Sequence, residues 1–314
     1  MKKLILAAAI AAVTANTATA ATVYDDKGLT FKIKGDWQVQ LRDNASDSKD
    51  TEVEFDDLEI KNSVVYDLGN GLKAFGQLDF GFKNAAEDKP GYNGDQLEEA
   101  YVGLAAHGVK VSVGKQNLAG YEFGVEGAYE TALEEDMFKA IATDGDDVIK
   151  VEADLDVATV IVSHELEADG EGSENGEATD FFVTADFDAI SVAAAYQTYT
   201  ATPGSADIDT WGVSAEFDAG FATFGADYSE SEQDGVNVDV SVTNLVAAFK
   251  ASKTTKIKVG FVNYEEDGGD DLDTWYANVT YKFPAQKNVS LFAEVSDTDD
   301  TDDTDVLAGM RIKF

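Results

Sequence analysis

The residues that could do chemistry in this chain are almost all carboxylates. There are 61 Asp and Glu against 23 Lys and Arg, only two histidines, and no cysteine. Without cysteine there are no disulfides, thiolate zinc sites or cysteine nucleophiles, and His107 and His164 are not spaced as metal ligands. Paired carboxylates can act as the general acid and base of a glycosidase. One interpretation of the sequence is therefore a secreted acidic β-sandwich protein or glycosidase. The formal net charge of -38 argues against nucleic acid as a partner, because a polyanion is repelled.

Two acidic segments near the C-terminus have the composition of a divalent-cation site. They are residues 267–271 (DGGDD) and 297–305 (DTDDTDDTD). Clustered carboxylates suit a hard cation such as Ca²⁺, but both segments lack the glycine and terminal glutamate pattern of an EF-hand loop. We therefore expect solvated charge and no dedicated metal site. Weak divalent binding is expected at most at Asp299, Asp300, Asp302 and Asp303, and no cofactor is expected.

The first twenty residues have the features of an export signal. Lys2 and Lys3 form a basic start, residues 4–13 are apolar, and Ala18 and Ala20 satisfy the small-residue rule for cleavage. The apolar run is far shorter than the ~20 residues that a membrane helix needs. The sequence therefore predicts a signal peptide over 1–20 and a single exported domain over 21–314.

Alternating polarity predicts that this domain is built from strands. Between Leu29 and Leu41, apolar residues such as Phe31 and Trp37 alternate with polar ones such as Lys32 and Gln38. A period of two is typical of a strand with one apolar and one polar face. Sixteen strands are predicted, at residues 29–42, 53–67, 72–83, 97–106, 108–116, 147–154, 156–166, 179–188, 189–199, 209–217, 221–229, 242–251, 256–265, 273–283, 288–296 and 304–314.

The aromatic residues at the ends of these strands indicate that the apolar face meets lipid. The stretch 275–283 has aromatic ends, and at ~3.3 Å per residue and ~40° tilt it spans about 20 Å, close to the ~25 Å apolar band of outer-membrane barrels. An open sheet edge in lipid would leave unpaired backbone groups, so the sheet has to close. The predicted fold is therefore all-β, a transmembrane antiparallel barrel of sixteen strands. A barrel of this size leaves an aqueous channel.

Several motifs resemble the general diffusion porins of Gram-negative bacteria, a family of sixteen-stranded trimers. They occur in order at residues 28–35 (GLTFKIKG), 67–75 (DLGNGLKAF), 99–104 (EAYVGL), 114–116 (GKQ) and 309–314 (GMRIKF). The resemblance implies a non-enzymatic homotrimer in the outer membrane, in contact with lipid and lipopolysaccharide, through which small hydrophilic solutes and cations diffuse. Phe314 resembles the terminal signal that the outer-membrane assembly machinery reads. A non-conducting surface barrel or adhesin is a second alternative.

By the same resemblance, the third long loop, about residues 117–146, folds inward and narrows the channel. Its carboxylates would come from Glu122, Glu126, Glu130 and Glu134. Relatives typically oppose this loop with a ladder of arginines, whereas this chain has only Arg42 and Arg311. The predicted residues of the pore wall are Lys32, Lys34, Lys61, Lys73, Lys115 and Glu98. A net negative constriction predicts cation selectivity; a solvated acidic surface loop is the alternative interpretation.

Overall fold

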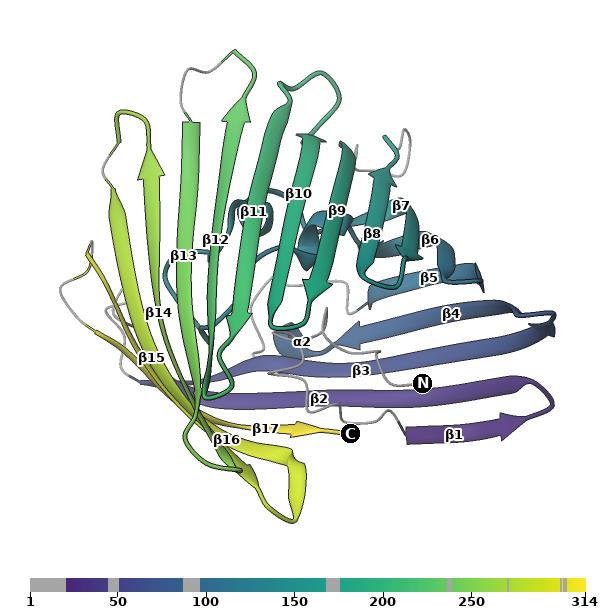
Figure 1. Ribbon diagram of the computed structural model, residues 1–314, viewed down its shortest axis with the longest axis horizontal. Coiled ribbons are helices and arrows are strands. Elements are labelled where there is room, and N and C mark those ends of the chain that lie inside the picture. Colours follow the sequence, from purple (N-terminus) through teal and green to yellow (C-terminus); the bar gives the residue numbers. More distant parts are fainter. Residues whose placement is uncertain are drawn as a thin grey trace.

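The computed structural model describes residues 21–44, 51–86, 97–167, 176–235, 239–269, 271–299, 301 and 304–314. Nearly all of these residues belong to antiparallel strands (Figure 1). The strands are β1 (Ala21–Asp26), β2 (Leu29–Asp43), β3 (Glu52–Gly69), β4 (Leu72–Gly81), β5 (Leu97–Ala106), β6 (Val109–Asn117), β7 (Asp144–Asp154), β8 (Ala158–Glu165), β9 (Glu177–Phe187), β10 (Ile190–Thr200), β11 (Ile208–Asp218), β12 (Ala222–Gln233), β13 (Asp239–Lys250), β14 (Thr255–Glu266), β15 (Leu272–Phe283), β16 (Gln286–Thr298) and β17 (Asp305–Lys313). The predicted signal peptide lies outside the described residues.

Strands β2 to β17 form a closed ring. Each strand pairs antiparallel with the next in sequence, and β17 returns to pair with β2 from Val306 opposite Asp43 to Lys313 opposite Asp36. Two backbone hydrogen bonds between Gly35 and Phe314, of 2.7 and 2.9 Å, extend this seam. The ring confirms the predicted sixteen-stranded antiparallel barrel and excludes the β-sandwich alternative.

Strand β1 is an addition that the sequence prediction missed. It pairs with the first half of β2, from Ala21 opposite Ile33 to Asp26 opposite Leu29. This is the same edge of β2 that β17 leaves free beyond Lys313, so β1 and β17 follow one another along it. Six residues are too few to establish an alternating pattern, which explains the omission.

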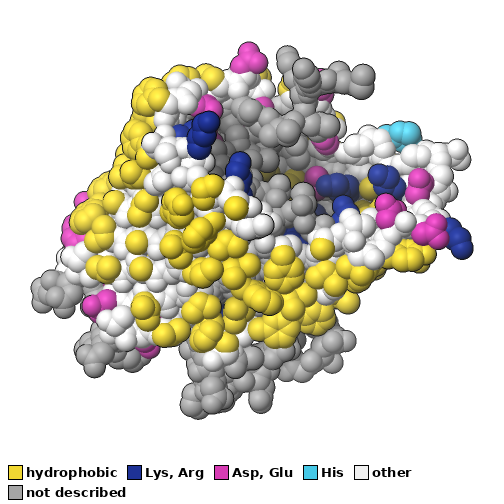
Figure 2. Space-filling view, turned by 90° about the horizontal axis from the view of Figure 1, so that it is seen from below, with side chains coloured by type: hydrophobic (Ala, Val, Ile, Leu, Met, Phe, Trp, Pro, Cys, Tyr) yellow, Lys and Arg dark blue, Asp and Glu magenta, His cyan; other side chains and the backbone are white. Residues whose placement is uncertain are grey.

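The two faces of the barrel wall have opposite polarity, as the alternation predicts. In β2, Trp37 and Leu41 are 43% and 54% exposed, whereas Gln38 and Gln40 between them are at most 2% exposed. Hydrophobic side chains gather in a broad band on the outer surface, and charged side chains lie in the hollow and at the rims (Figure 2). An apolar exterior around a polar interior is the arrangement required of a barrel in lipid.

The connections at the two ends of the barrel differ in length. At one end the strands are joined by short turns, such as the one at Asn70 and Gly71, whose φ angles are 55° and 77° as a tight hairpin requires. At the other end the connections are longer, and that between β6 and β7 contains helices η1 (Ala119–Glu122) and α3 (Met137–Ile141). Helix α2 (Lys83–Ala86) follows β4. No helix in the described part of the chain is long and apolar enough to cross a membrane.

Candidate functional site

The segment 118–143, between β6 and β7, is hydrogen-bonded to the polar face of the barrel wall. Its backbone N–H groups donate to acceptors on three strands. The N–H of Ala119 donates to Ser163 Oγ of β8 (2.7 Å) and that of Gly120 to Asp180 Oδ2 of β9 (2.6 Å). The N–H of Val125 donates to Asp227 Oδ2 of β12 (2.8 Å). The acceptors are themselves buried, so the segment shields them from water.

The same segment continues across the wall to β16. The backbone N–H groups of Tyr129 and Glu130 each donate to the carboxylate of Glu294, both at 2.7 Å. Asn278 of β15 donates to the carbonyl of Gly127 (2.9 Å) and also to Glu294 (2.8 Å). These bonds fix the turn at Tyr129 and Glu130 against strands far from β6 and β7 in the ring.

Apolar side chains of the segment pack against apolar residues on the inner wall. Phe123 and Phe138 lie with ring centroids 4.9 Å apart, and Met137 packs beside Tyr276. The wall side of these clusters includes Ile161, Phe182, Ala195, Val242 and Val262. Burying such side chains within an otherwise polar interior holds the segment by the hydrophobic effect as well as by hydrogen bonds.

The two acids that start helix α3 have structural positions. Glu135 accepts hydrogen bonds from the backbone N–H of Gly127 (2.8 Å) and the hydroxyl of Tyr276 (3.0 Å). Asp136 is the N-cap of α3, accepting from the Lys139 N–H (3.1 Å). Burial raises the pKa of Asp136 to about 8 and lowers the pKa of Lys139 to about 8. In the sequence, Glu135 and Asp136 look like the other acids of this acidic segment, so no pattern distinguishes them.

The four predicted loop glutamates fall into two groups. Glu122, Glu126 and Glu134 are exposed, with Glu126 in contact with the ammonium of Lys139. Glu130 is half-buried and attached to the wall: Gln40 Nε2 donates to it at 3.2 Å and Arg42 Nη1 at 3.4 Å. Burial raises the pKa of Glu130, while Arg42 acts in the opposite direction.

Two cationic side chains on the wall, those of Arg42 and Lys61, are each in contact with several carboxylates. Arg42, only 11% exposed at its side chain, lies within 3.8 Å of Glu54, 3.4 Å of Glu130 and 3.4 Å of Asp305. Lys61 lies 2.6 Å from Asp79 and 3.2 Å from Glu99. Arg42 was not among the predicted wall residues. The alternation on β2 could have found it, since it follows Gln38 and Gln40 on the same face.

The closing seam contains the second arginine. Arg311 of β17 donates to both carboxylate oxygens of Asp36 on β2, at 2.8 and 2.5 Å, and lies 2.5 Å from Asp57 of β3. Lys313 contributes a further contact to Asp36 at 2.8 Å. This network joins the last strand of the barrel to the first two strands of the ring.

The other predicted wall residues lie at different positions. Lys32, Lys34 and Lys73 are exposed, and the register places them opposite Ser63, Lys61 and Asp67 respectively. Lys115 differs from them. Its ladder partner is Ala100, on the face of β5 that carries the exposed Val102, and its Nζ lies 2.6 Å from Asp146.

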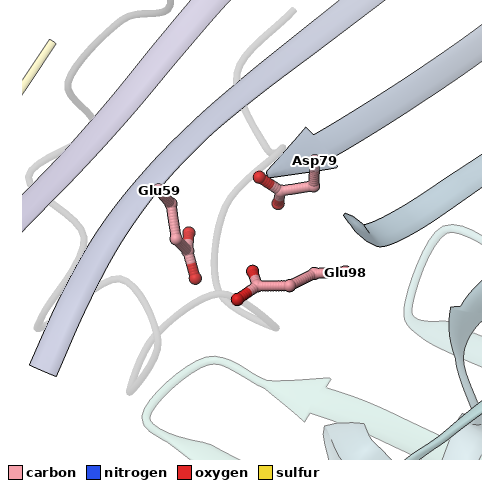
Figure 3. A group of neighbouring side chains, drawn as sticks. All are labelled: Glu59, Asp79 and Glu98. Carbon is pink, nitrogen blue, oxygen red and sulfur yellow. The ribbon is translucent and has the colours of Figure 1, made fainter. Parts of the chain in front are cut away.

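Glu98 belongs to a group of three acids in neighbouring strands. Glu59 of β3, Asp79 of β4 and Glu98 of β5 each offer a carboxylate oxygen, and these oxygens lie within 4.8 Å of one another (Figure 3). Such a group could hold a metal ion.

Weak divalent binding was predicted elsewhere, at four aspartates near the C-terminus. Of them only Asp299 lies within the described residues, where its N–H bonds to the carbonyl of Asp273, and Asp300, Asp302 and Asp303 lie outside.

Phe314 closes the ladder at the end of β17. Its ring packs edge-on against Trp37, with centroids 5.0 Å apart, and covers Gly35, where a Cβ would collide with it. The last residue of the chain is thus part of the seam.

Comparison with known proteins gives a consistent family and fold. A family model described as Gram-negative porin matches residues 7–303. Porin-like protein H of Photobacterium profundum is 22% identical over the whole of both chains. Among solved structures, OmpT of Vibrio cholerae in its trimer form has a TM-score of 0.74 at 19% identity, covering 92% of this chain and 100% of that chain. An anion-selective porin from Comamonas acidovorans has a TM-score of 0.77 at 14% identity, covering 91% and 100%. Structural likeness at these identities concerns the fold alone, while the family match spans most of the sequence. The chain belongs to the Gram-negative porin family.

Proposed function

We propose that this barrel is a water-filled channel that prefers cations to anions and is narrowed by the inward-folded segment 118–143. As a Gram-negative porin, the chain forms an outer-membrane channel for diffusion. Solutes move down their gradients with no chemical step, so the wall acts on them through size and charge. The sign of that charge decides the selectivity.

The observation that carries the cation preference is the excess of carboxylates around Arg42 and Lys61. Arg42 contacts three carboxylates and Lys61 contacts two, so each cation is outnumbered by its own partners. Exposed Glu122 and Glu134 make no hydrogen bond or ion pair with other described residues and add further negative charge. In a confined aqueous channel, an excess of carboxylates concentrates cations and excludes anions.

The proposal also covers how the protein is exported and assembled. The relative OmpT of Vibrio cholerae occurs as a trimer, and we propose a homotrimer here. The apolar outer band would contact membrane lipid and lipopolysaccharide. We further propose that the assembly machinery reads Phe314 at the end of β17 and that the leader is cleaved after Ala20.

Planar-bilayer recording of the detergent-extracted protein tests the channel. We expect stepwise conductance in potassium chloride, with a reversal potential of the sign that cation selectivity requires. The double variant Glu122→Gln/Glu134→Gln should reduce this potential while the steps persist. Glu177→Gln is the matched control, because Glu177 is an exposed acid at the start of β9 outside the segment. A folded protein without conductance would support the surface barrel or adhesin instead.

A further inference from the structure

Three carboxylates inside the barrel converge on one space. Glu59, Asp79 and Glu98 come from the adjacent strands β3, β4 and β5, and Figure 3 shows their carboxyl groups turned toward one another. Their oxygens lie within 4.8 Å of one another. A Ca²⁺ ion binds oxygens at ~2.3–2.6 Å, so oxygens on opposite sides of one ion are about 5 Å apart. The spacing therefore suits a single shared ion.

An orphaned oxygen independently indicates a missing ligand at this place. Asp79 is only 2% exposed, and its Oδ1 is buried with no hydrogen-bond donor among the described residues. Buried carboxylate oxygens in native proteins normally have a partner, because the charge loses its hydration. Glu59 and Glu98 likewise form no hydrogen bond or ion pair within the described part of the chain. A cation in the shared space would satisfy all three groups.

Lys61 is not the missing partner of Asp79 Oδ1. Its ammonium lies 2.6 Å from the other oxygen of Asp79, Oδ2, and 3.2 Å from Glu99. It thereby holds Asp79 in place and leaves Oδ1 free of a donor. Four carboxylates, those of Glu59, Asp79, Glu98 and Glu99, then share one ammonium, for a formal charge of -3 before any ion binds.

We propose that Glu59, Asp79 and Glu98 bind a divalent cation of the calcium class inside the channel and that its binding weakens the channel's cation preference. Calcium fits better than magnesium because Ca²⁺ accepts irregular sets of six to eight oxygens, whereas Mg²⁺ demands a near-ideal octahedron at shorter distances. The exposed Glu98 leaves room for water to complete the coordination.

The three carboxylates lie beside Lys61 on the polar inner face of β3, β4 and β5. An ion bound there would reduce the net negative charge that draws cations into the channel. The effect on selectivity rests on the proposed channel function, but the binding of the ion does not.

Calcium titration of the folded, detergent-solubilised protein tests the binding directly. Isothermal calorimetry of the wild type should show a site with a dissociation constant on the order of 0.1–1 mM, the range of weak extracellular calcium modules. The variant Glu59→Gln/Glu98→Gln should lose it. Glu216→Gln is the matched control: Glu216 is a half-buried acid on the inward face of β11. It should bind calcium as the wild type does.

Bilayer recording then tests the consequence and separates the two proposals. Conductance and cation preference in the presence of EDTA depend only on the proposed function. Added calcium should move the reversal potential of the wild type and the control variant toward zero, and should leave that of the double variant unchanged. A calcium response that survives in the double variant, or a wild type that binds no calcium up to about 10 mM, roughly ten times the weakest affinity expected, overturns the site while the channel stands.

Discussion

Glu294 of β16 holds the turn at Tyr129 and Glu130 in segment 118–143, and its replacement should loosen that turn. Glu294 is 3% exposed, and its carboxylate accepts the N–H groups of Tyr129 and Glu130, each at 2.7 Å. In Glu294→Ala both backbone donors lose an ionised acceptor, and Asn278 loses its hydrogen bond to the same carboxylate. Hydrogen bonds to charged groups contribute about 1.5–3 kcal/mol each, so the turn should lose about 3–6 kcal/mol. Water that enters from the lumen can bond to the two freed N–H groups, so we expect a loss at the lower end of this range.

The rest of the segment should stay in place. The hydroxyl of Tyr129 remains 2.7 Å from Thr280, and its ring remains stacked on Phe292 with centroids 4.2 Å apart. Contacts to Ser163, Asp180 and Asp227 are also untouched. We therefore expect local release of the turn rather than loss of the barrel.

Hydrogen exchange measured by mass spectrometry is the direct assay. A loss of 3–6 kcal/mol corresponds to about 10²–10⁴-fold faster exchange at the amides of Tyr129 and Glu130, since every 1.4 kcal/mol is tenfold. Glu294→Gln keeps one acceptor oxygen and should lie between the alanine variant and the wild type. Glu216→Ala, on the inward face of β11, controls for the loss of an interior acid. Unchanged exchange at these two amides in Glu294→Ala would refute the anchoring role.

Three further predictions concern the segment and the seam. Gly124→Ala should destabilise the segment by about 1–3 kcal/mol, because Gly124 has φ 98° and a Cβ there would meet Asp136 at 2.6 Å. Gly235→Ala is the control, because its Cβ would meet nothing within 4 Å. Equal melting temperatures of the two variants would contradict the prediction. The pKa of Asp136 is raised from 3.8 to about 8, so its contribution to stability is fully present below about pH 4 and is lost as the pH rises through about 8. Asp136→Asn should therefore flatten the pH dependence of the melting temperature between these values. An identical pH dependence in the wild type and the variant would be inconsistent with a buried acid. Arg311→Gln should destabilise the barrel by about 1.5–3 kcal/mol, because Asp36 and Asp57 lose the guanidinium that joins them. Gel mobility should show that the variant unfolds at a lower temperature than the wild type. An unchanged unfolding temperature would contradict the prediction.

The strands were predictable because one face of each had to meet lipid. Alternation of residues such as Trp37 and Gln38 fixes the face of every position, and all sixteen predicted strands occur in the ring. The ends were less certain, since β7 begins at Asp144 rather than at the predicted residue 147, and β4 ends at Gly81 before helix α2. Alternation fades where a strand meets a connection, so its limits depend on hydrogen bonds that the sequence does not display.

The roles of individual acids could not be predicted from the sequence. Glu294, Asp180 and Asp227 are ordinary polar positions of alternating strands, yet each accepts a backbone N–H from the segment between β6 and β7. Their function depends on where a distant segment lies. Lys115 illustrates a second limit. The neighbouring Gly114, at φ 125°, lies at a register shift between β6 and β7, and such a bulge changes which way a side chain faces.

The most direct test of the account is the reversal potential of the wild-type channel in a potassium chloride gradient, measured with EDTA at low and at high salt. The Debye length is about 30 Å at 0.01 M and 3 Å at 1 M, so wall charges act across the channel only at low salt. We predict a cation-selective potential at low salt that shrinks toward zero at high salt. An anion-selective potential, or one that is zero at low salt, would contradict the claim that excess carboxylates govern the channel.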